Sequence, residues 1–114
     1  MGSRNMASNQ APLQSRRSTR VPLKIALGME GVAESPPCEG ETIVVNLHGA
    51  LISSAIELRV GMRIWIHVYL TDKRATAQVV FVDSENPLRC GIELDKPQNI
   101  WGMHLPPDDW RKDL

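Results

Sequence analysis

The stretch that decides the fold is Met62-Arg-Ile-Trp-Ile-His-Val-Tyr-Leu70. Its apolar residues Met, Ile, Ile, Val and Leu occupy every second position, and Arg, Trp, His and Tyr lie between them. Successive side chains of a β-strand point to opposite faces of the sheet, so this period of two predicts a strand with one face in the core. The same alternation in Leu23–Met29 predicts a second half-buried strand.

Four other short segments have the β-branched or alternating character of strands, namely Thr42–Leu47, Ala50–Ser54, Ala75–Val82 and Leu88–Leu94. Between them, Glu34–Glu41 is expected to be a loop, because two prolines and a glycine interrupt a sheet ladder. The sequence therefore predicts an all-β protein, a closed six-stranded antiparallel barrel without exposed edges. Pro106–Trp110 is expected to open one short helical turn at the C-terminus.

Length and composition allow one domain. The 114 residues are 42% hydrophobic and 23% charged, which is typical of a soluble protein, and no apolar run is long enough for a membrane span. We expect residues 1–14, part of which reads as an expression tag, to be disordered, residues 15–104 to form the barrel with its arm, and residues 105–114 to form a tail. Cys38 and Cys90 are expected to be free thiols of a cytoplasmic protein.

The formal net charge of zero conceals a cationic arm on an anionic body. Residues 1–24 contain five basic residues and no acidic one, whereas the rest of the chain contains eight basic and thirteen acidic residues. Three of the basic residues are Arg16, Arg17 and Arg20. A guanidinium group offers a planar pair of donors that matches two phosphate oxygens. Such an arm can clamp a phosphate-bearing ligand, fold back onto the acidic domain or remain a solvated tail.

The order of Arg16-x-x-x-Arg20, six strands and an Asn-Leu-x-Gly-Ala-Leu segment after the second strand resembles the PilZ domain. The resemblance covers about residues 15–104 and includes Val21-Pro22, Leu58–Gly61 and Cys90–Leu94. PilZ domains are six-stranded barrels that bind the bacterial second messenger cyclic di-GMP through an R-x-x-x-R motif and a D/N-x-S-x-x-G motif. The resemblance implies that Arg16, Arg17 and Arg20 grip this ligand.

The second motif departs from the family pattern. The chain reads Asn46-Leu-His-Gly-Ala-Leu51. Aligned on Asn46, His48 stands where the family has serine and Gly49 comes two residues early; aligned on Gly49-Ala-Leu51, two residues are missing from the loop. Asn46, His48 and Gly49 remain the expected barrel side of the ligand site. A shorter loop displaces these groups by several ångströms, since each residue spans up to ~3.5 Å. Asn46 and His48 can equally be turn residues without a ligand, because asparagine often bonds its own backbone.

The resemblance implies a cyclic di-GMP receptor in bacterial signalling, with a protein partner that reads the bound state. The alternative is a PilZ-like adaptor that no longer binds the nucleotide and acts through a protein interface. No arrangement of residues predicts an enzyme, a metal site or a cofactor other than the ligand. Trp65, His67 and Tyr69 share one strand face, either as a stacking surface or as a face covered by the arm or tail. We expect no DNA or RNA partner.

Overall fold

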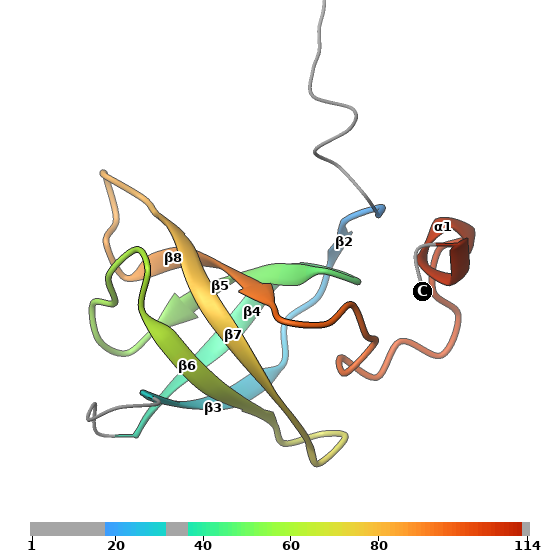
Figure 1. Ribbon diagram of the computed structural model, residues 1–114, viewed down its shortest axis with the longest axis horizontal. Coiled ribbons are helices and arrows are strands. Elements are labelled where there is room, and N and C mark those ends of the chain that lie inside the picture. Colours follow the sequence, from blue (N-terminus) through green and yellow to red (C-terminus); the bar gives the residue numbers. More distant parts are fainter. Residues whose placement is uncertain (1–17, 32–36, 113–114) are drawn as a thin grey trace, which may run out of the picture.

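The computed structural model describes residues 18–31 and 37–112, and within them it contains seven strands and one short helix. The strands form one antiparallel sheet in the order β2-β4-β3-β6-β7-β8-β5, and an additional pairing of β4 with β5 closes it. Six strands therefore make a closed barrel, which Figure 1 shows from the side of β6 and β7. The bounds are β2 Val21–Pro22, β3 Ala26–Gly31, β4 Cys38–Asn46, β5 Gly49–Ser54, β6 Arg63–Val68, β7 Lys73–Val82, β8 Arg89–Leu94 and α1 Asp108–Lys112.

The predicted barrel and C-terminal helical turn are confirmed. The alternation in β6 has the expected effect, because Ile64, Ile66 and Val68 are at most 1% exposed and point into the barrel. The core is built mainly from aliphatic side chains, which is necessary in a chain with 4% aromatic residues. The expectation for Leu70 was wrong: the strand ends at Val68, the chain turns, and the Leu70 side chain is 71% exposed.

Two other strand boundaries were wrong. The segment predicted as one strand, Leu23–Met29, belongs to a strand only from Ala26, where β3 begins, and residues 23–25 lie between β2 and β3. Here the Thr42 hydroxyl also bonds the backbone: it accepts from Ile25 N at 3.0 Å and donates to Leu23 O at 2.5 Å. Two backbone bonds to β4 remain, from Leu23 N to Ile43 O and from Thr42 N to Ile25 O. The side-chain alternation persists through this break, since Leu23 and Ile25 still pack against the core.

The predicted loop at Glu34–Glu41 was also wrong in its second half, because β4 begins at Cys38. Residues 32–36 lie outside the described part of the chain. Gly40 does not interrupt the ladder. A Cβ atom there would lie 2.5 Å from Ser53 O and 2.8 Å from Met29 Cε, so glycine is required where β4 passes close to its neighbours.

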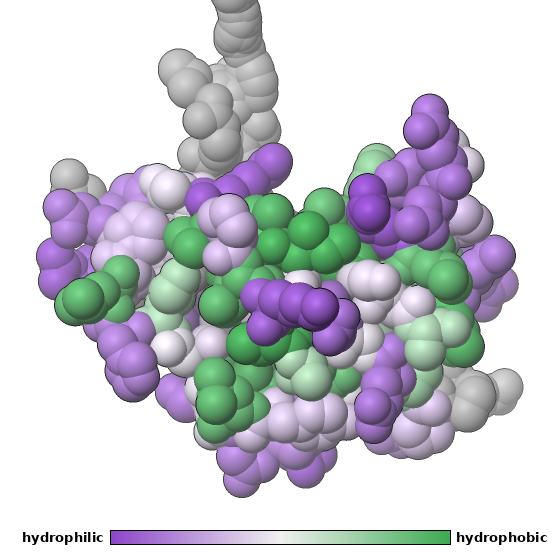
Figure 2. All heavy atoms as spheres, turned by 180° about the vertical axis from the view of Figure 1, so that it is seen from behind, coloured by the Kyte–Doolittle hydropathy of each residue, from purple (hydrophilic) through white to green (hydrophobic). Residues whose placement is uncertain are grey.

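The C-terminal segment packs against the barrel beside the beginning of the described chain. Trp101 and Trp110 are each 1% exposed, so both anchor this segment. Figure 1 shows α1 beyond the barrel, on the side of β2. No helix of the described residues is long and apolar enough to cross a membrane. Seen from behind the view of Figure 1, apolar side chains gather around the middle of the face, a strongly hydrophilic residue lies across them, and polar regions surround them (Figure 2).

Candidate functional site

The β4–β5 hairpin brings three of the predicted site residues together. Asn46 pairs with Gly49, so the turn contains only Leu47 and His48. The Asn46 side chain organises this turn, because its Oδ1 accepts hydrogen bonds from the backbone N of His48 and of Gly49, both at 2.9 Å. Asn46 thus has the turn-forming role that asparagine commonly takes. Its oxygen is already occupied within the turn.

Gly49 has a packing requirement of its own. A Cβ atom at this position would lie 2.0 Å from Ile92 O and 3.0 Å from Ile92 C, which are backbone atoms of the neighbouring strand β8. Only glycine allows β5 and β8 to approach in this way. The motif glycine is therefore required by the barrel, whatever else it contacts.

Ser18, two residues before Arg20, is fixed to the hairpin. Ser18 is 1% exposed, and its Oγ accepts a hydrogen bond from Leu47 N at 3.1 Å. Asn46 Nδ2 donates to Ser18 O at 3.5 Å. This part of the arm therefore lies against the turn that carries the second motif, although the arm and the turn are far apart in the sequence.

The C-terminal helix fixes the next residue of the arm. Thr19 donates from both its backbone N and its Oγ1 to Asp109 Oδ2, at 3.0 and 2.8 Å, and Trp110 Nε1 donates to Thr19 O at 2.8 Å. Trp101 Nε1 donates to Asn46 O at 2.8 Å. We call these contacts of Ser18 and Thr19 the arm root. They hold the backbone next to Arg20 while the Arg20 side chain remains exposed.

Arg20 and the hairpin border one cavity of about 610 Å³ on the outside of the barrel. We call it the Arg20 cavity; it is lined by Arg20 and by residues 44–46, 48–51, 80–81 and 91–93. Four predicted site residues, Arg20, Asn46, His48 and Gly49, line it together. Arg16 and Arg17 lie outside the described residues.

The sequence analysis missed the far wall of this cavity. Val80 and Phe81 on β7, and Gly91 and Glu93 on β8, belong to the lining. Phe81 is the one phenylalanine of the chain, and its side chain is 50% exposed. That exposure was not visible in the sequence, because period-two alternation assigns Phe81 to the core side of its strand together with Ala75, Ala77 and Val79.

A second cavity of about 650 Å³ lies over β3 and β6, and its lining includes Trp65, His67 and Tyr69. Two of these side chains already have partners. His67 Nε2 lies 2.8 Å from Asp72 Oδ1, and the His67 and Tyr69 rings meet edge to face at 5.0 Å. This cavity is slightly larger than the Arg20 cavity, but it is the weaker candidate for the ligand site, because neither Arg20 nor the Asn46–Leu51 segment lines it.

The sequence matches no family model and none of the curated proteins with which it was compared. Among solved structures, it is similar to the crystal structure of the PilZ domain of CeSA from a cellulose-synthesizing bacterium. The TM-score is 0.55 at 17% sequence identity, over 68% of this chain and 80% of that domain. The chain therefore has a PilZ-like fold, in a sequence that has diverged widely from this neighbour.

Proposed function

We propose that this domain is a cyclic di-GMP receptor and that the ligand occupies the Arg20 cavity. The observation that carries the proposal is the common lining of one cavity by Arg20 and by Asn46, His48 and Gly49. These residues come from the two segments that resemble the ligand motifs of PilZ domains. The PilZ-like fold of the barrel supports the same function.

In this proposal Arg20, with Arg16 and Arg17 before it, binds the phosphates of the ligand. Arg20 forms no ion pair with any side chain in the described part of the chain, so its charge is available to an anion. The arm root supports the assignment, because a fixed backbone reduces the entropy lost when the side chain becomes ordered. Ligand binding then orders the arm, and a protein partner reads the new surface.

His48 takes the place of the family serine at the edge of the cavity. Its imidazole can donate a hydrogen bond to the ligand or lie against a base. Asn46 contributes by shaping the turn, since its Oδ1 already accepts two backbone hydrogen bonds. That occupied oxygen favours the second candidate function, an adaptor that binds a protein and no nucleotide.

Isothermal titration of the purified domain with cyclic di-GMP at low salt separates the two functions. A receptor gives saturable binding. Arg20→Ala weakens the binding free energy by about 1.5–3 kcal/mol, a tenfold to hundredfold loss of affinity. Binding weakens as salt is added, because the ligand is a dianion. His48→Ala has a smaller effect.

Arg59→Ala is the matched control, because Arg59 is exposed and does not line the Arg20 cavity. It should bind like the wild type. A flat wild-type titration up to about 100 μM ligand, with no change in thermal stability, contradicts the receptor and leaves the adaptor. Equal losses in Arg20→Ala and Arg59→Ala contradict the assignment of Arg20 to the site, since they indicate a general charge effect.

A further inference from the structure

A β-bulge in β7 turns two consecutive apolar side chains outward. Val79 pairs with Ile92 and Phe81 with Gly91, so the register shifts by one residue at Val80. Before the bulge Val79 points into the core, and after it Val82 packs against the core again. Both residues between them therefore face outward, with Val80 47% and Phe81 50% exposed.

The residue opposite Phe81 has no side chain. A Cβ atom at Gly91 would lie 3.3 Å from Phe81 Cβ and 3.7 Å from Phe81 Cδ2, so the phenyl group leans over the bare backbone of β8. On the other side of Gly91 is Leu51, which pairs in turn with Val44. Val44, Leu51, Gly91 and Phe81 thus form an apolar row across four strands, and all four line the Arg20 cavity.

A polar row runs beside it, two residues further along each strand on the same face. It comprises Asn46, Gly49 and Glu93, which are paired across β4, β5 and β8. Arg20 lies at the same cavity. The cavity is therefore divided into an apolar half, bounded by an aromatic ring, and a half that contains polar and charged groups. A nucleotide has the same division between its flat base and its phosphate.

We propose that Phe81 is the stacking surface for a purine base of the ligand, which lies over Gly91 with one flat face against the phenyl ring. This inference rests on the proposed function, because it names how the same cavity recognises the base. Base–aromatic stacking contributes substantially to affinity and requires no hydrogen bond to the base. It supplies a contact on β7 that does not depend on the shortened Asn46–Leu51 loop.

Phe81→Leu tests the proposal, because leucine retains an apolar side chain and removes the aromatic face. We expect its affinity for cyclic di-GMP to fall about tenfold or more, and that of Phe81→Trp to stay equal or rise. Gly91→Ala, which adds a methyl group to the floor, should also weaken binding. Val80→Ala is the matched control, and its affinity should change less than that of Phe81→Leu.

A direct measurement uses the single phenylalanine of the chain, whose ring protons give an unambiguous set of NMR signals. Nuclear Overhauser effects between these protons and guanine H8 of bound cyclic di-GMP are the expected result. Wild-type binding with neither this contact nor an effect of Phe81→Leu overturns the stacking role and leaves the receptor function intact. A wild-type domain that does not bind overturns both.

Discussion

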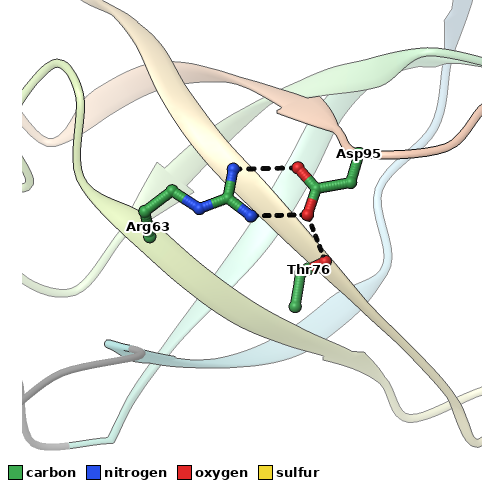
Figure 3. Close-up of polar contacts among 3 residues, drawn as sticks. All are labelled: Arg63, Thr76 and Asp95. Carbon is green, nitrogen blue, oxygen red and sulfur yellow. Dashed lines mark hydrogen bonds and ion pairs between the residues drawn. The ribbon is translucent and has the colours of Figure 1, made fainter.

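Arg63 and Arg20 both lie on the outside of the barrel, and their surroundings differ. The two terminal nitrogens of Arg63 donate to the two carboxylate oxygens of Asp95, at 2.9 and 2.5 Å, and Thr76 Oγ1 donates to Asp95 as well (Figure 3). Arg20 has a firmly held backbone on its N-terminal side and no carboxylate partner among the described residues. Within the described residues, Arg63 is paired with a carboxylate, whereas Arg20 is not.

The pKa values of Arg63 and Asp95 are both shifted by their contact. The hydrogen bond to Asp95 raises the pKa of Arg63, and the hydrogen bonds from Arg63 and Thr76 lower the pKa of Asp95 below its ordinary value of 3.8. These three residues hold β6, β7 and the end of β8 together. The comparison indicates that charges in this cluster serve stability, while in the proposed function the charge of Arg20 serves binding. The predictions below test that division.

The largest expected effect concerns the arm root. Trp110→Ala should lower the free energy of unfolding by about 3–5 kcal/mol, because it removes a fully buried indole that packs against the core. The same change removes the hydrogen bond to Thr19 O, so ligand affinity should fall as well. Chemical denaturation and ligand titration measure the two effects.

Trp65→Ala is the control for this variant, because Trp65 is the same residue type with a side chain 49% exposed. It should cost much less stability than Trp110→Ala and leave affinity unchanged. Equal losses in both variants would contradict the role of Trp110 in holding the arm.

The next effect concerns the motif glycine. Gly49→Ala should destabilise the domain by about 1–3 kcal/mol, because the added methyl group meets the backbone of Ile92 and β5 must move away from β8. Gly91→Ala should cost less, since the nearest atom to its methyl group belongs to the Phe81 side chain. Thermal unfolding of the two variants checks the order. A Gly49→Ala domain as stable as the wild type would show that this glycine is not required by packing.

The next prediction, with a smaller expected effect on stability, compares Arg63 and Arg20 directly. Arg63→Ala should lower stability only slightly, because an exposed ion pair contributes little even when its geometry is bidentate. Its ligand affinity should not change. Arg20→Ala should show the reverse, with unchanged stability and reduced affinity. A loss of affinity in Arg63→Ala would contradict the division, and denaturation curves with parallel titrations provide the measurement.

Most of the barrel could be predicted from the sequence, because alternation depends only on which face of a strand is buried. Ile64, Ile66 and Val68 illustrate this, and each points inward as expected. One error lies where a side chain of another strand joins the backbone bonding. The Thr42 hydroxyl bonds the backbone at Leu23 and Ile25, and no pattern in residues 23–29 reveals a partner in another strand.

Part of the lining of the Arg20 cavity, the candidate site, could also be predicted from a local pattern in the sequence. Arg20, Asn46, His48 and Gly49 were found through motif spacing, which is a local property of the sequence. Phe81 was missed, because its outward position depends on a bulge that shifts the register by one residue. A Val-Val-Phe-Val run carries no polar residue that marks where alternation fails. Gly91 offered a weak signal, since a glycine within a strand often marks a close approach.

The smallest expected effect is the pH dependence of the Arg63–Asp95 pair. Because the pKa of Asp95 is lower in the folded protein than in the unfolded chain, the ionised carboxylate favours folding. Its contribution is present above pH 3.8 and is lost as the pH falls through the lowered value. The wild type should therefore exceed Asp95→Asn in denaturation midpoint by a constant amount between about pH 5 and 7. That difference should shrink below pH 3.8.

Added salt should reduce the same difference, since both side chains are partly exposed to solvent. Arg20→Ala provides the control, because no carboxylate of the described residues pairs with Arg20 and its stability should equal that of the wild type at every pH. An Asp95→Asn difference that persists unchanged in acid would show that Asp95 stabilises the barrel through packing and not through its charge. The contrast between the two arginines would then fail at Arg63, because the Arg63–Asp95 pair would not stabilise the barrel through charge. The binding test at Arg20 would not be affected by this result.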